Sequence, residues 1–211
     1  MTALAAGGRQ VRDAEDLIER YCGLRWSGGD DETWAFRYFD LIPDSSPDEI
    51  TPLDVVSCAA LHPGLKQSDL AWFWDHRLQL RNALAEFPDD LDLAGSPGSI
   101  TQILQQLPAT LPGVDLSLLS KVLHRKRPRL IPMLERSLLN QYRDQLLGRG
   151  AQAWPNLVLA MQADLALQEN RVILERVQDR LLRALAHTPS ALRLLDIAVW
   201  MQPHSKTGRL R

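Results

Sequence analysis

Cysteine is scarce in this chain of 211 residues, and so are long apolar runs. Only Cys22 and Cys58 occur, and they do not form a C-x-x-C pair, which excludes a disulfide framework and favours a reducing compartment. No apolar run is long enough to cross a membrane, and the first eight residues lack the basic and apolar regions of a secretory signal. These absences predict a cytoplasmic protein without a membrane partner.

The sequence also lacks the usual signatures of metals and cofactors. Its five histidines are scattered, and none has metal-ligand spacing to another histidine, a cysteine or an acid. Glycine-rich phosphate loops are absent, as is a cysteine cluster for an iron–sulfur centre near the C-terminus. We therefore expect no metal and no cofactor.

Charge is small in total but unevenly distributed. The formal net charge is −2, so no global field indicates a nucleic-acid or membrane partner. Residues 1–54 nevertheless hold 12 acids and 5 bases, whereas residues 116–134 hold no acid. This second segment contains six basic residues: Lys121, His124, Arg125, Lys126, Arg127 and Arg129. Either it forms a nucleic-acid surface, or it pairs with the acidic N-terminal part.

The hydrophobic pattern predicts an all-α array of about eight helices joined by short turns. Residues 1–50 form an acidic segment, a helix plus an aromatic arm, that we expect to pack on a helical domain of residues 51–203, followed by a basic tail at 204–211. The segment at 34–42 fits a strand, an extended arm or a short helix. Thr51, Pro52 and Asp54 mark a helix start, with a cap, a first-turn proline and an acid. The predicted helices span residues 11–22, 51–61, 69–87, 100–107, 116–125, 133–147, 155–187 and 189–201.

One segment indicates a helix-hairpin-helix element near residues 100–125. The loop between the fourth and fifth predicted helices closes in Leu111-Pro112-Gly113-Val114. Gly113 permits a backbone conformation that a side chain would block. The amides that open the next helix, with its positive dipole end behind them, would then form a phosphate site. Asp115 follows directly; its carboxylate would either repel a phosphate or cap the helix.

This hairpin resembles the L-P-G-hydrophobic-G motif of the helix-hairpin-helix DNA glycosylase superfamily. In that family a connection ending in proline leads to a catalytic aspartate, and Glu135 falls near that position after Pro132. The resemblance implies a glycosylase-like fold, DNA as the partner and, if the protein is an active enzyme, an N-glycosylase-type hydrolase. Residues 120–132, with Lys126-Arg127-Pro128-Arg129-Leu130-Ile131-Pro132, look like an actinobacterial family of uncharacterised proteins with a K-R-P-x-L-I-P core.

The departures from the glycosylase pattern leave catalysis open. The second glycine of the hairpin is Asp115, and the nucleophilic lysine of lyase-type members would fall near Ser117. Lys121 lies one turn later and could substitute only in a rearranged site. The acid is Glu135, one methylene longer than aspartate, and a charge displaced by about 1 Å can cost ~100-fold in rate.

Two functions follow from these patterns. The first is a protein that binds the backbone of duplex DNA, with Glu135 as the catalytic acid of an altered excision reaction and Lys121 as a weaker candidate. Its expected DNA contacts come from Gly113, Val114, Ser117, Lys121, Arg125, Lys126, Arg127 and Arg129. The second is a catalytically silent protein-interaction or regulatory module on the same scaffold. A cleft beside Glu135, next to the turn at Gly113 and the basic run, favours the first. A Glu135 on a flat surface, or locked by an arginine, favours the second.

Two further expectations concern packing. Asp196 lies inside an apolar helix and needs a partner, for which Arg127 and Arg129 are the candidates. Trp72, Phe73 and Trp74 are adjacent on a predicted helix, so they cannot all face the core, and one of them should reach a second surface.

Overall fold

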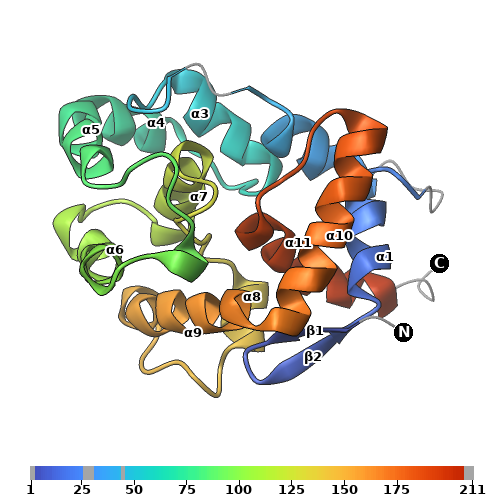
Figure 1. Cartoon of the computed structure of the whole chain (residues 1–211). Helices are drawn as coiled ribbons and strands as arrows, with labels where there is room; N and C mark the ends of the chain where they lie inside the picture. The colour runs from blue at the N-terminus through green and yellow to red at the C-terminus, as the bar shows by residue number, and fades with distance from the viewer. Residues whose placement is uncertain (1–2, 26–30, 44–45, 207–211) are drawn as a thin grey trace.

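The computed structural model describes residues 3–25, 31–43 and 46–206, and within them the chain is mostly helical, as predicted (Figure 1). The described residues contain eleven α-helices, a two-stranded hairpin, a π-helical turn η1 (Phe36–Asp40) and three short 3-10 turns. Residues 207–211, the greater part of the predicted basic tail, lie outside the described residues. The helices are α1 (Ala14–Tyr21), α2 (Asp31–Ala35), α3 (Pro52–Ser57), α4 (Gln67–Asp75), α5 (Arg77–Ala85), α6 (Gly98–Thr110), α7 (Leu116–Lys126), α8 (Arg136–Gln141), α9 (Trp154–Ala166), α10 (Gln168–Leu185) and α11 (Ala191–Lys206).

A small antiparallel hairpin at the N-terminus corrects the all-α prediction. Strand β1 (Ala3–Ala6) pairs with β2 (Arg9–Arg12), and Gly7 and Gly8 join them with φ values of +60° and +73°. A two-residue hairpin turn of this kind requires positive φ, which glycine adopts without strain. Asn170 of α10 then pairs with Ala5 as a third strand would, donating to its carbonyl and accepting from its amide, both at 2.8 Å.

Several helix boundaries also differ from the prediction. The first helix begins at Ala14 because the residues before it belong to β2. The predicted helices at 69–87 and 155–187 are each divided in two, at His76 and at Leu167, whose extended ψ of 128° ends α9 and caps α10. Of the helix predicted at 133–147, only α8 is α-helical. The aromatic segment at 34–42 forms the end of α2 and then η1.

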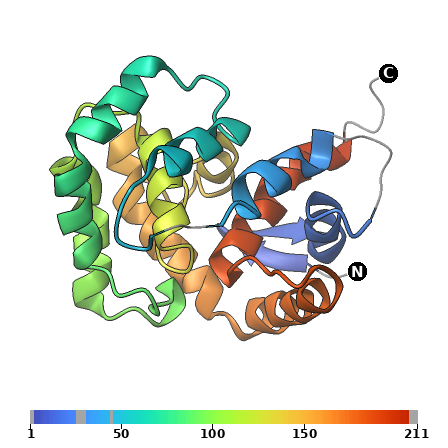
Figure 2. The same ribbon diagram turned by 90° about the horizontal axis from the view of Figure 1, so that it is seen from above.

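Elements from opposite ends of the sequence lie side by side. Helix α1 lies against α10 and α11 (Figures 1 and 2). Glu15 of α1 forms ion pairs with Arg176 and Arg180 of α10, and all residues from 192 to 199 in α11 are buried. Helix α7 is buried throughout residues 118–124, so α7 and α11 both run through the core. Two of the predicted site residues of α7, Lys121 and Lys126, are therefore buried.

Candidate functional site

The turn between α6 and α7 lies where the sequence predicted it. Leu111 is buried, and Gly113 is exposed with a φ of +96°. A Cβ at Gly113 would lie 3.3 Å from Nε1 of Trp72, so the turn sits close to α4. The Asp115 carboxylate accepts from the amides of Ser117 (2.7 Å) and Leu118 (3.2 Å). The amides predicted to hold a phosphate are thus occupied by the chain's own carboxylate.

Val114 and Ser117, the other predicted contacts of this turn, are half-buried. Val114 packs against the hydrophobic core. Ser117 holds Lys121, since the Lys121 ammonium donates to its hydroxyl at 2.6 Å. Neither side chain is arranged as an open anion cradle.

The basic run of α7 and the following turn is paired with acids of this chain. The side chains of Arg125, Lys126 and Arg127 are only 5%, 0% and 2% exposed. Arg129, at 49%, is the more exposed member. Each cation has a carboxylate partner: Lys121 with Glu135, Arg125 and Lys126 with Asp54, Arg127 with Asp48 and Asp89, and Arg129 with Asp92.

The buried cations bind two segments of the chain, residues 39–47 and residues 84–87, to α7 and the residue that follows it. Arg125 also donates to the carbonyls of Phe39 and Ile42, and Lys126 to that of Ser46. Arg127 donates to carbonyls on both sides of it, those of Pro47, Leu84 and Phe87. Arg125, Lys126 and Arg127 therefore pair with the acidic N-terminal part, as one of the two alternatives predicted. Lys121 and Arg129 pair with acids further along the chain. Arg125, Lys126 and Arg127 do not lie on the surface where a DNA phosphate could reach them.

Lys121 and Glu135 lie together, as a site combining the two candidate catalytic residues requires. Lys121 Nζ is 2.6 Å from Glu135 Oε1, and their side chains are 1% and 16% exposed. Glu135 directly precedes α8, so the start of this helix places its carboxylate over the ammonium of α7. The acid is held by a lysine, and not by the arginine expected of a catalytically silent module.

Asp196 is buried beside Arg193, one helical turn away, and not beside Arg127 or Arg129. Burial raises the pKa of Asp196 to about 6; the Arg193 charge opposes this rise and the Glu135 charge adds to it. Arg193 also forms an ion pair with Asp40 at 2.8 Å. The prediction of a buried partnered carboxylate is right, but the partner comes from the same helix.

The remaining titratable groups of the core give no nucleophile or metal ligand set. Burial raises the pKa of the Cys58 thiol to about 12 and that of Cys22 well above its usual range. Burial and, to a smaller extent, the Arg193 charge lower the pKa of His124 to about 4, so this histidine is neutral at pH 7. Among the residues that the structure describes, no group of three His, Cys, Asp or Glu side chains is placed to hold a metal ion.

An apolar groove between η1 and α3 is exposed on the surface. It encloses about 230 Å³, and Ser57 is its one polar lining residue. Four of the side chains that line it, Trp34, Tyr38, Leu53 and Val56, are between 47% and 54% exposed. The Trp34 and Tyr38 rings lie 4.1 Å apart. This site had no counterpart in the sequence prediction, although Trp34 and Tyr38 lie four residues apart, one turn of a helix.

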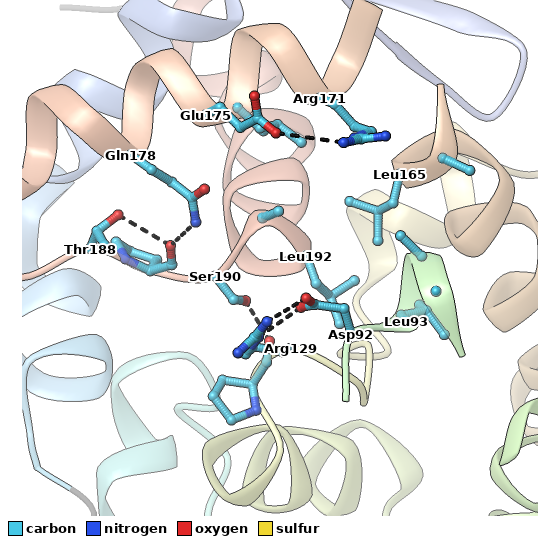
Figure 3. A pocket seen from close by; sticks show the side chains of 17 residues that line it. Asp92, Leu93, Arg129, Leu165, Arg171, Glu175, Gln178, Thr188, Ser190 and Leu192 are labelled. Carbon is cyan, nitrogen blue, oxygen red and sulfur yellow. Dashed lines mark hydrogen bonds and ion pairs between the residues drawn. The ribbon is translucent and has the colours of Figure 1, made fainter. Parts of the chain in front are cut away.

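A cavity lies between α10, the start of α11 and the segments at 92–95 and 128–129 (Figure 3). Its volume is about 760 Å³. Figure 3 shows Arg171 and Glu175 on the α10 side and Arg129 with Asp92 on the opposite side. Glu135 lines neither this cavity nor the apolar groove.

None of the helices that the structure describes is long and apolar enough to cross a membrane. In comparisons with known proteins, no curated protein and no solved structure matches the chain. The model of a family of unknown function, DUF6308, matches residues 14–203, and no link to the helix-hairpin-helix glycosylases emerges. Because this match spans most of the sequence, the chain belongs to the DUF6308 family.

Proposed function

We propose that this protein is a catalytically silent protein-interaction module whose binding surface is the apolar groove between η1 and α3. The observation that carries the proposal is the gathering of four exposed apolar side chains, Trp34, Tyr38, Leu53 and Val56, around one groove. Contiguous exposed apolar patches on soluble folds commonly mark protein interfaces. The groove runs between two helical elements, which suits a partner helix that inserts an apolar stripe.

The area available supports binding of moderate strength. Burying a large apolar side chain contributes roughly 1.5–3 kcal/mol. Four side chains that are each about half exposed would therefore contribute roughly 3–6 kcal/mol before the cost of association. Aromatic side chains are also frequent among the residues that dominate interface energies.

The internal pairing of the basic run argues against the alternative of binding through the DNA backbone. Non-specific affinity for DNA depends on cations that replace counterions at phosphates. Arg125, Lys126 and Arg127 are already buried against carboxylates and carbonyls. Releasing them would leave Asp54 buried and unpaired, which is strongly unfavourable.

The test is a comparison of two leucine variants as affinity baits in extract of the source cells. Leu53→Asp places a charge in the groove at the first turn of α3, where an acid suits the helix dipole. Leu147→Asp is the control, because Leu147 is 73% exposed and lies outside the groove. We expect a protein retained by the wild type and by Leu147→Asp but not by Leu53→Asp. After purification, this protein should bind Leu53→Asp at least tenfold more weakly than it binds the wild type. Equal retention by all three baits would refute the assignment of the groove.

A second candidate function, excision of a base from DNA, is favoured by the 2.6 Å separation of Lys121 Nζ and Glu135 Oε1. In this reaction the bond between the sugar and the base breaks and water adds to the sugar carbon. The Glu135 carboxylate would stabilise the positive charge that develops on the sugar, and Lys121 would hold this carboxylate in position.

This candidate is tested with duplex oligonucleotides that carry modified bases. Base release by the wild type that disappears in Glu135→Gln, with the circular dichroism spectrum unchanged, would support excision. A gel shift with unmodified duplex over a salt series tests binding alone, since phosphate contacts produce a steep salt dependence. If no modified base is released and no duplex is retarded at low salt, this second function is excluded.

A further inference from the structure

The 760 Å³ cavity has the size of a small-molecule site and does not depend on the proposed interaction groove. Pockets for small ligands commonly enclose about 300–1,000 Å³ and combine an apolar lining with a few polar groups. Its exposed apolar surface comes from Ala94, Pro128 and Ala166. Four buried leucines also border it, Leu93, Leu165, Leu174 and Leu192, and each is at most 4% exposed.

The ionic groups of the cavity are balanced on both walls. The α10 wall carries Arg171 and Glu175, and the opposite wall carries Arg129 and Asp92 (Figure 3). With two cations and two anions, the lining has no net charge that would select a polyanion or a polycation. A small ligand that itself carries both signs matches this lining better than one that carries a single sign.

The two ion pairs differ in how firmly they are made. Arg129 grips Asp92 through two donors, with Nε 2.8 Å from Oδ1 and Nη2 bonded to Oδ2. Arg171 and Glu175 are 3.9 Å apart, and their side chains are 56% and 65% exposed. A solvent-exposed pair of this kind contributes little, so a ligand can replace it at little cost. The α10 wall is therefore the side that can accept ionic groups from a ligand.

We propose that this cavity binds a free α-amino acid with a large apolar side chain. Its carboxylate would contact Arg171, its ammonium would contact Glu175, and its side chain would lie against the exposed apolar lining of Ala94, Pro128 and Ala166. The two ionic groups of an α-amino acid are attached to one carbon, which matches a cation and an anion that lie one helical turn apart. Arginine suits this role because its planar guanidinium binds a carboxylate through two hydrogen bonds.

The experiment uses three probes that share a phenyl group and differ in charge: L-phenylalanine, 3-phenylpropionate and phenethylamine. Isothermal titration calorimetry measures their affinities, and NMR shifts of the leucine methyl groups report the site. We expect L-phenylalanine to bind with a Kd of about 1 mM or tighter, at least tenfold more tightly than either analogue. Arg171→Gln and Glu175→Gln should each remove this tenfold preference.

Arg183→Gln is the matched control, because Arg183 is exposed on the same helix and does not line the cavity. It should bind L-phenylalanine as the wild type does. The proposal is overturned if L-phenylalanine produces neither heat nor leucine methyl shifts at about 10 mM. It is also overturned if 3-phenylpropionate binds equally well, or if the preference for the amino acid survives in both α10 variants.

Discussion

Asp54 connects the N-terminal third of the chain to α7, and its replacement should be among the most damaging single changes. Its carboxylate lies 2.6 Å from Lys126 Nζ and 3.3 Å from Arg125 Nε, and the side chain is 1% exposed. The same carboxylate accepts from the Thr51 amide at 2.8 Å and completes the capping box of α3. Asp54→Ala therefore removes a helix cap and the counterion of two buried cations at once.

The expected loss follows from these two roles. Removing one partner of a buried ion pair costs about 3–5 kcal/mol, because the remaining charge is left uncompensated. Loss of the cap adds about 1 kcal/mol. We therefore expect Asp54→Ala to lower the free energy of unfolding by about 4–6 kcal/mol, a large part of the 5–15 kcal/mol that is typical of a folded protein. The melting temperature should fall by roughly 10–20 °C.

The pH dependence supplies an independent check on Asp54. Burial acts to raise its pKa, but hydrogen bonds from Lys126 and Thr51 outweigh burial and lower it. A carboxyl whose folded-state pKa is lowered stabilises the fold above its unfolded pKa of about 3.9, and loses this effect as the pH falls through the folded pKa. The gap between wild type and Asp54→Ala should therefore narrow on acidification below about pH 4.

Urea denaturation followed by tryptophan fluorescence measures these differences. The control is Asp144→Ala, which breaks an ion pair with Arg9 in which Asp144 is 66% exposed, and which should remain close to wild type. The double variant Asp54→Ala/Lys126→Met should lose less than the two single variants together, because it leaves no buried charge unpaired at this pair. A loss below about 1 kcal/mol for Asp54→Ala would refute the argument that it anchors buried cations.

Three further predictions concern the core and the α6–α7 turn. Because the raised pKa of Asp196 disfavours its ionised form in the fold, its contribution is fully present below about pH 3.9 and is lost as the pH rises through 6. Asp196→Asn should therefore gain stability relative to wild type by about 2 kcal/mol between pH 4 and pH 7 in urea titrations, and a constant difference would contradict this. Gly113→Val forces a β-branched residue to a φ of +96° beside Trp72 and should cost about 1–3 kcal/mol in thermal unfolding; an unchanged melting temperature would show that the turn is not strained. Glu135→Gln leaves the buried Lys121 without a counterion and should cost about 2 kcal/mol, most of which Lys121→Met should restore in the double variant.

Local chemistry made several features of this protein readable from sequence. Thr51, Pro52 and Asp54 form the predicted cap of α3, and Asp115 caps α7 as the weighed alternative proposed. Each of these interactions joins residues within three positions, so the sequence itself contains both partners. The Pro112-Gly113 turn and the helices on either side of it were predictable for the same reason. The N-terminal hairpin had a local signal too, in Gly7-Gly8, but the alternation of apolar and polar residues on either side is too short to predict strands.

Other features depended on partners that are distant in the sequence. The long predicted helix divides at Leu167, just before Asn170 in the first turn of α10. Asn170 is a polar residue that is buried, because its side chain pairs with the backbone of Ala5 in β1. Trp72, Phe73 and Trp74 separate as expected: Phe73 is buried, Trp72 stacks on His76 at 4.1 Å, and Trp74 is 60% exposed. The sequence could not indicate which of the two tryptophans would face solvent.

The amino-acid pattern predicts a mostly helical chain with a basic segment at 121–129 and an acidic segment before residue 55. That the two segments meet is visible only in the folded molecule, where Asp54 and Asp48 form ion pairs with Arg125, Lys126 and Arg127. The sequence gives the sign of each charge but does not show whether the charged side chain is buried. A cation taken out of water is tolerated only where a carboxylate accompanies it, and that carboxylate can come from any part of the chain. Packing therefore places Arg125, Lys126 and Arg127 inside the protein, where they bind residues 39–54 to α7 and the turn after it.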